Sequence, residues 1–220
     1  MTSTNPFTQR SVVEVAPVEE QPVAEVDAVL GDQVETSGPR QPLARLSDAV
    51  PARLLPLGSS DGTGALRVVS THGGAGGSTL TQLLGTALAD DVGTLWPEPH
   101  PWVPESGSGR VLLVARSHRT GLLALREVLT AWHAGAYAAG LPLVGACVID
   151  DGPHLSKAQV AEIRSLTAMC PHGWHLPWQE SLRMTAPAEA ALSARAKWTL
   201  SRVRHHATHG DTPQKKDTPR

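Results

Sequence analysis

Residues 70–79 read STHGGAGGST, and this glycine cluster decides how the chain folds around it. The apolar run at 65–70, ALRVVS, comes directly before the cluster and predicts a buried strand. After the cluster, apolar residues recur at the spacing of one helical face, which predicts a helix from Ser78 to Leu88. The strand, the glycine loop and the helix follow one another without a gap. This order predicts a phosphate-loop-type turn.

Apolar runs and amphipathic stretches continue to alternate after this first helix. The predicted strands are residues 110–116 (RVLLVAR), 143–149 (LVGACVI) and 174–176, and the predicted helices are residues 120–140, 156–169 and 186–206. Such alternation is typical of a parallel sheet with helices on both faces. We therefore predict an α/β fold with a mostly parallel, three-layer sheet of about five strands.

The organisation of the 220-residue chain follows from where its apolar residues are concentrated. Residues 1–64 are acidic and rich in proline, and we predict that they form a disordered tail. Residues 65–185 are the predicted α/β domain, 186–206 a C-terminal amphipathic helix, and 207–220 a disordered basic tail. The chain contains no apolar stretch that suggests export or membrane insertion, so we expect a cytoplasmic protein.

The glycine loop has the composition of an anion-binding turn. Glycines let the backbone turn tightly and direct several N–H groups inward, and the following helix adds the partial positive charge of its N-terminus. The predicted binding residues are Gly73, Gly74, Ala75, Gly76, Gly77, Ser78 and Thr79. A flexible glycine turn without a ligand is the alternative interpretation of the same residues.

The loop resembles the deviant phosphate loop of the ParA and MinD class of ATPases, whose pattern is K-G-G-x-G-K-[ST]-T. Residues 72–79 supply the matching positions, with three glycines and the Ser-Thr pair in place. The later segments VLLVARSHRTGLLALREVL, LPLVGACVID and GWHLPWQESLR are similar to the late elements of that class. Over residues 65–185 the resemblance implies a truncated P-loop NTPase fold. It also implies ATP and Mg²⁺ as ligands, with Ser78 as the magnesium ligand.

Both lysines of that pattern are missing, because His72 and Gly77 stand in their places. A hydrogen bond to a charged partner is worth about 1.5–3 kcal/mol, so losing two would weaken ATP binding by about 3–6 kcal/mol. Arg116 and Arg119 are candidates for a replacement phosphate clamp, with ordinary solvated arginines as the alternative. We also expect no strand ending in a metal-organising aspartate between the first helix and residues 110–116.

A second group of residues has the composition of a zinc site. Cys170, His172 and His175 lie close together in CPHGWH, and Cys147 is a candidate fourth ligand. Only one short spacing is present, whereas structural zinc sites usually have two. The alternative, which we favour, is that both cysteines are reduced, buried thiols.

Five of the six tryptophans fall into two groups by their neighbours. Trp96, Trp102 and Trp178 each lie beside a proline, which predicts packing of a non-helical connection or a partner surface. Trp132 and Trp198 lie on apolar helical stripes and are predicted to be in the core.

Three hypotheses about function follow. We prefer a pseudo-enzyme, in which a degenerate P-loop domain without catalytic residues binds or scaffolds a protein partner. A resemblance to uncharacterised actinobacterial families associated with plasmids and conjugation implies an accessory role in plasmid partitioning or DNA transfer. The second hypothesis is a weak ATP-dependent switch, and the third is a nucleic-acid-associated protein that uses the basic residues of the C-terminal helix. A homodimer is compatible with each.

Overall fold

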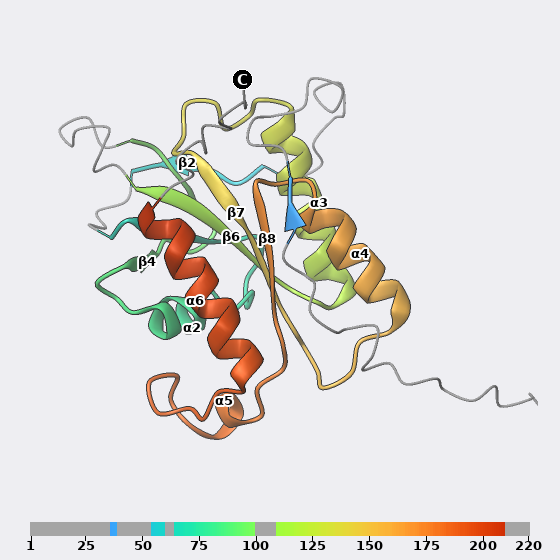
Figure 1. The fold of residues 1–220 in the computed structure, drawn as a ribbon. Helices are drawn as coiled ribbons and strands as arrows, with labels where there is room; N and C mark the ends of the chain where they lie inside the picture. The colour runs from blue at the N-terminus through green and yellow to red at the C-terminus, as the bar shows by residue number, and fades with distance from the viewer. Residues whose placement is uncertain (1–35, 39–53, 60–63, 100–108, 210–220) are drawn as a thin grey trace, which may run out of the picture. The chain divides into compact units, whose positions relative to one another are not determined.

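The computed structural model describes residues 36–38, 54–59, 64–99 and 109–209. Most of both predicted tails, together with Trp102, falls outside these residues. The described part of the chain is an α/β structure in which helices cover both faces of a mostly parallel sheet (Figure 1). The predicted fold class is therefore confirmed.

The main sheet has the strand order β1-β8-β7-β6-β3-β4. Its strands are β1 (Thr36–Ser37), β3 (Leu66–Ser70), β4 (Ala89–Asp91), β6 (Arg110–Arg116), β7 (Leu143–Ile149) and β8 (His172–Leu176). Only the two-residue strand β1 runs antiparallel, against β8, so five described strands are parallel as expected. A second, small sheet pairs β2 (Leu57–Gly58) with β5 (Trp96–Pro97).

Each face of the main sheet is covered by a pair of helices (Figure 1). One pair is α3 (Arg119–His133) and α4 (Lys157–Thr167), the other is α2 (Gly77–Leu84) and α6 (Ala194–His209), and the short α5 (Ser181–Met184) precedes α6. All seven residues of β7 are buried, because the helices exclude water from both faces of the sheet. This explains why the central strands are continuous apolar runs rather than alternating ones.

Glycine ends the first helix earlier than the apolar spacing predicted. α2 stops at Leu84, because Gly85 has a φ of 99° and its N–H donates to the carbonyl of Thr81. A positive φ of this size favours glycine and takes the backbone out of the helical conformation. Ala87, one of the apolar residues at the spacing that predicted this helix, is exposed. The expected helix reaching Leu88 is therefore wrong in its last turn.

The later helices also differ from prediction at their ends. α4 begins as expected, because the Ser156 hydroxyl accepts a hydrogen bond from the Gln159 N–H in a capping box. α3 ends at His133, before the Gly140–Pro142 region that we expected to close it. The C-terminal helix begins at Ala194 instead of residue 186. It packs on β8 and α2, so its apolar side forms part of the same core as the sheet.

β4 corrects part of one negative prediction. We expected no strand ending in a metal-organising aspartate between the first helix and residues 110–116. The structure has a strand there, because β4 (Ala89–Asp91) pairs in parallel with β3 and ends at Asp91. The strand is short and polar, and it lies at the edge of the described sheet, where charged side chains reach solvent. It therefore lacks the apolar run by which the other strands were identified.

The tryptophans have three kinds of environment. Trp96 is completely buried in the core, so the packing role predicted for it is confirmed. Trp132 is buried as predicted, whereas Trp198 is 50% exposed on α6, so its predicted place in the core is wrong. Trp178 is partly buried beside the sheet.

None of the helices in the described part of the chain combines the length and the apolar character that a membrane span needs.

Candidate ligand-binding site

A cavity of about 340 Å³ lies at the carboxyl ends of the parallel strands. It is lined by Gly76, Thr79, Arg116, Ile149, Asp150, Asp151, Leu176, Pro177, Trp178, Gln179, Leu182 and Arg183. These residues follow or end β3, β6, β7 and β8, which are neighbours in the sheet. Open α/β sheets bind ligands at this edge, so the cavity is the candidate functional site.

Of the seven predicted binding residues, two line the cavity and five do not. Gly76 and Thr79 line the cavity. Ala75 is buried in the core beneath the loop, while Ser78 is exposed and does not line the cavity. Gly73 and Gly74 are exposed, with open space around them. The remaining residue, Gly77, is buried on the side of the loop that faces β4.

The loop conformation leaves backbone donors available at the start of α2. Gly74 has a φ of 76° and Gly76 a φ of 94°, which are conformations that glycine adopts without strain. Gly76 caps α2 without a side-chain hydrogen bond, and the first turn carries no acidic residue. The first N–H groups of a helix have no partner within it, so these donors and the helix dipole are free to attract an anion.

Gly77 is fixed by its neighbours rather than by its backbone angles. A Cβ atom at this position would overlap the Ser70 hydroxyl and would lie 3.1 Å from a carboxylate oxygen of Asp91. A side chain at the position where the resembling pattern has a lysine therefore requires the Ser70 hydroxyl to shift. The close packing of Gly77 against side chains of β3 and β4 therefore disfavours a lysine at this position.

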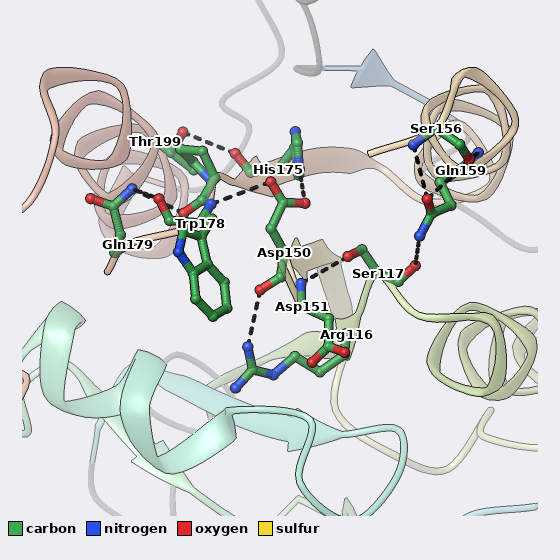
Figure 2. Close-up of polar contacts among 11 residues, drawn as sticks. Arg116, Ser117, Asp150, Asp151, Ser156, Gln159, His175, Trp178, Gln179 and Thr199 are labelled. Carbon is green, nitrogen blue, oxygen red and sulfur yellow. Dashed lines mark hydrogen bonds and ion pairs between the residues drawn. The ribbon is translucent and has the colours of Figure 1, made fainter. Parts of the chain in front are cut away.

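Arg116 brings a positive charge to the loop from the end of β6. Its guanidinium donates to the carbonyl oxygen of Asp150 at 3.0 Å, as Figure 2 shows. Its Nε lies 3.8 Å from where a Cβ at Gly76 would be, so the charge is directly beside the loop. Arg119, the other predicted clamp residue, is exposed and does not line the cavity. Of the two arginines, the structure brings only Arg116 to the site.

Asp150 connects three parts of the site (Figure 2). One carboxylate oxygen lies 2.6 Å from Nε2 of His175, and the other accepts a hydrogen bond from the backbone N–H of Trp178 at 3.3 Å. Asp150 and His175 are both buried, at 7% and 5% exposure. A buried, hydrogen-bonded pair of this kind holds its partners in fixed positions. Asp150 therefore sets the position of the Trp178 segment relative to Arg116.

The segment after β8 forms the opposite wall of the cavity. The Trp178 indole N–H donates to Glu180 at 2.9 Å, and the Arg183 guanidinium lies 5.7 Å from the indole ring centre. The Gln179 side chain accepts from the N–H of Ser193 at 2.8 Å and donates to its hydroxyl at 3.1 Å. These contacts hold a flat aromatic surface and a second cation against the cavity.

His72 takes a structural role outside the cavity. Its Nε2 accepts a hydrogen bond from the backbone N–H of Arg116 at 3.3 Å, and its Nδ1 lies 2.8 Å from the carbonyl oxygen of Gly73. These contacts fit a neutral ring protonated on Nδ1. His72 thus ties the start of the loop to β6, and the cavity lining does not include it.

The structure separates the candidate zinc ligands. Cys170 packs in the core under α3 and α4, whereas Cys147 packs in the core under α2 and α6. Among the described residues, no three His, Cys, Asp or Glu side chains are grouped to hold a metal ion. Both cysteines are free and buried, as the alternative predicted.

We expect both thiols to be unreactive in the folded protein. Burial raises the pKa of Cys147 to about 12, with Asp150 adding to the shift, and burial likewise raises the pKa of Cys170 to about 12. At about pH 8 neither thiol is appreciably ionised, and the thiolate is the reactive form. Ellman's reagent should therefore label neither thiol in native protein and both in denaturing guanidinium chloride. Rapid labelling of either native thiol would contradict this burial.

Several residues of the site carry no recognisable motif in the sequence. These are Asp150 and Asp151, which follow β7, and Gln179 and Arg183, which follow β8. A usable signal exists, because polar residues directly after consecutive apolar strands of a parallel sheet meet at one edge. Applied to residues 150–151 and 177–179, that rule identifies this wall of the cavity.

Comparison with known proteins gives one match. A family of unknown function, DUF6668, matches residues 64–200, a range that includes the glycine loop, all residues of the cavity lining and the start of α6. No curated protein and no solved structure matched the chain. Because the match spans more than half of the 220 residues, the chain belongs to the DUF6668 family.

Proposed function

We propose that this protein is a degenerate phosphate-loop protein that binds a small anionic ligand of the nucleotide type without hydrolysing it. One observation carries the proposal: the glycine loop and the Arg116 guanidinium lie side by side in the lining of the same cavity. Backbone donors, a helix dipole and one arginine together suit a phosphate or carboxylate group. Trp178, which lines the same cavity, adds an aromatic side chain that suits the body of the ligand.

The residues present fit an anion better than they fit a magnesium–triphosphate group. Ser78, the expected magnesium ligand, lies outside the cavity lining. Asp91, on the far side of Gly77, already accepts a hydrogen bond from the N–H of Gly93 at 3.0 Å. Phosphoryl transfer depends on charge stabilisation around the outer phosphate, and neither lysine of the resembling pattern is present to provide it. We therefore derive no hydrolytic step for this site.

A ligand in the cavity would contact the ends of four elements at once, so its binding would stiffen the domain. α6 packs on both α2 and β8, so stiffening of these two elements on ligand binding would also affect the surface of α6. We propose that the ligand-bound domain scaffolds a protein partner. The resemblance to ParA and MinD proteins and to plasmid-associated families supports an accessory role in plasmid partitioning or DNA transfer.

Arg116→Ala should weaken ligand binding much more than Arg119→Ala. Removing a charged hydrogen-bond donor costs roughly 10- to 150-fold in affinity. Arg119 is the matched control, because it lies close by in the chain but outside the cavity. Calorimetric titration of the wild type and both variants with AMP, ADP and ATP measures the difference, and thermal unfolding checks that each variant folds.

A phosphate-release assay beside these titrations separates this proposal from a weak ATP-dependent switch. We expect phosphate release from ATP by the wild type to equal that of a Ser78→Ala variant. Turnover above that variant would support the switch. Equal losses in Arg116→Ala and Arg119→Ala would show that the ligand binds elsewhere.

Nucleic-acid binding through the C-terminal helix remains a second proposal. α6 carries Arg195, Lys197, Arg202 and Arg204 and no acidic residue. However, the Arg204 guanidinium donates to the carbonyls of Leu83 and Leu84 at the end of α2, so one of these charges is used within the fold. Salt-dependent binding of labelled DNA that is lost in Lys197→Ala protein would support this proposal.

A further inference from the structure

We infer that the cavity selects a ligand with a single phosphate, of the nucleoside monophosphate class, over a triphosphate. This inference rests on the proposed function, because it specifies the ligand of the same site. Three observations support it: the balance of charged side chains in the cavity lining, the Asp91 carboxylate beside the glycine loop, and the volume of the cavity.

The charged side chains that line the cavity cancel one another. Among the described residues they are two arginines, Arg116 and Arg183, and two aspartates, Asp150 and Asp151. Protonation of His175, the partner of Asp150, adds at most one positive charge. A ligand with one phosphate can place it between the loop and Arg116. Beyond Arg116, the described lining holds one further cation, Arg183, so the additional charges of a triphosphate outnumber the cations left and are repelled by the aspartates.

The side of the loop facing β4 is also unfavourable for further phosphates. The Asp91 carboxylate lies beside Gly77, where the resembling pattern has a cation. The nearest buried cation on β3 is Arg67, which is 5% exposed and forms an ion pair with Asp90. This ion pair joins β3 to β4, and the cavity lining does not include Arg67. A phosphate chain extending past Gly76 in this direction would therefore meet negative charge.

The cavity size agrees with the charge. A volume of about 340 Å³ is at the small end of the range for ligand pockets, which is about 300–1,000 Å³. Much of the wall is apolar or aromatic, from Ile149, Leu176, Leu182 and Trp178. Such a wall suits a ring, and the polar end has room for one anionic group. The geometry points to an amphiphilic monoanion or dianion as the ligand.

The test compares AMP, ADP and ATP as probes, each with EDTA and again with Mg²⁺, by calorimetric titration of the full-length protein. We expect AMP to bind at least about tenfold more tightly than ATP in EDTA. Asp151→Asn and Asp91→Asn should each narrow the ratio of AMP to ATP affinity, because each removes a repulsive charge. Glu162→Gln, at an ion pair with Arg126 outside the cavity, is the matched control and should leave the ratio unchanged.

The outcomes separate this inference from the function on which it rests. If ATP binds more tightly than AMP and Arg116→Ala weakens both, the proposed function stands and the charge selection is overturned. An unchanged ratio in both aspartate variants would also overturn it, because the repulsion argument would have failed. If none of the three nucleotides binds, the proposed function and the inference fall together. AMP preference that narrows in Asp151→Asn and Asp91→Asn supports both.

Discussion

Gly77→Lys is expected to destabilise the folded protein instead of restoring a nucleotide site. By sequence alone, this substitution looks like the return of a missing phosphate-binding lysine. In the structure, the Cβ atom of any residue at this position would overlap the Ser70 hydroxyl and press against Asp91. Ser70 is 8% exposed and belongs to a buried strand, so its hydroxyl would have to shift within the packed interior. Overpacking of this kind costs about 1–3 kcal/mol.

Gly73→Lys is the matched control for this prediction. Gly73 lies in the same loop, and a Cβ atom there would meet nothing within 4 Å. It also adds one positive charge, so the two variants differ mainly in packing. Urea unfolding should show a loss of stability in Gly77→Lys that is absent from Gly73→Lys. Full stability of Gly77→Lys, combined with a gain in ATP affinity, would mean that the loop retains an open lysine site.

Trp96→Ala should cause the largest loss of stability among the substitutions considered. Trp96 is completely buried, and its ring stacks on Tyr137 with the ring centres 4.1 Å apart and the planes 1° from parallel. The Tyr137 hydroxyl in turn accepts a hydrogen bond from the N–H of Leu55 at 2.8 Å. Removing the indole would open a cavity beneath the small sheet of β2 and β5. Such substitutions cost about 3–5 kcal/mol.

Trp198→Ala provides the comparison, since Trp198 is 50% exposed on α6 and contacts Arg202 at 6.0 Å from the ring centre. Its loss should cost less than about 1.5 kcal/mol. Chemical denaturation of both variants measures the difference directly. Equal stability losses would contradict the assignment of Trp96 to the core and of Trp198 to the surface.

The central strands were predictable because burial on both faces of the sheet requires a continuous run of apolar residues. The runs RVLLVAR and LVGACVI are β6 and β7 with the predicted bounds. β4 was missed because an edge strand of sequence ADD has no apolar run. The end of α2 was missed because apolar spacing continues past Gly85, while the backbone of that glycine ends the helix. Apolar periodicity indicates which side chains can be buried, whereas the residue at which a helix ends depends on backbone conformation, as at Gly85.

The site was predictable only in outline. The glycine loop could be located from its place between a strand and a helix. Arg116 and Arg119 could not be separated, because only the three-dimensional structure places one guanidinium beside Gly76 and leaves the other in solvent. The contacts of Asp150 with His175 and Trp178 join residues about 25 to 28 positions apart, and no local pattern specifies such pairings.

The central claim is that the glycine loop, Arg116 and the segment after β8 form one ligand site. Titrating ¹⁵N-labelled protein with AMP and following the backbone amide resonances tests it most directly. We predict that the amides of Gly76, Thr79, Asp151 and Trp178 shift together with a single dissociation constant, and that Arg116→Ala weakens that constant. Shifts confined to α6, or unchanged amides at these four residues at saturating AMP, would contradict the claim.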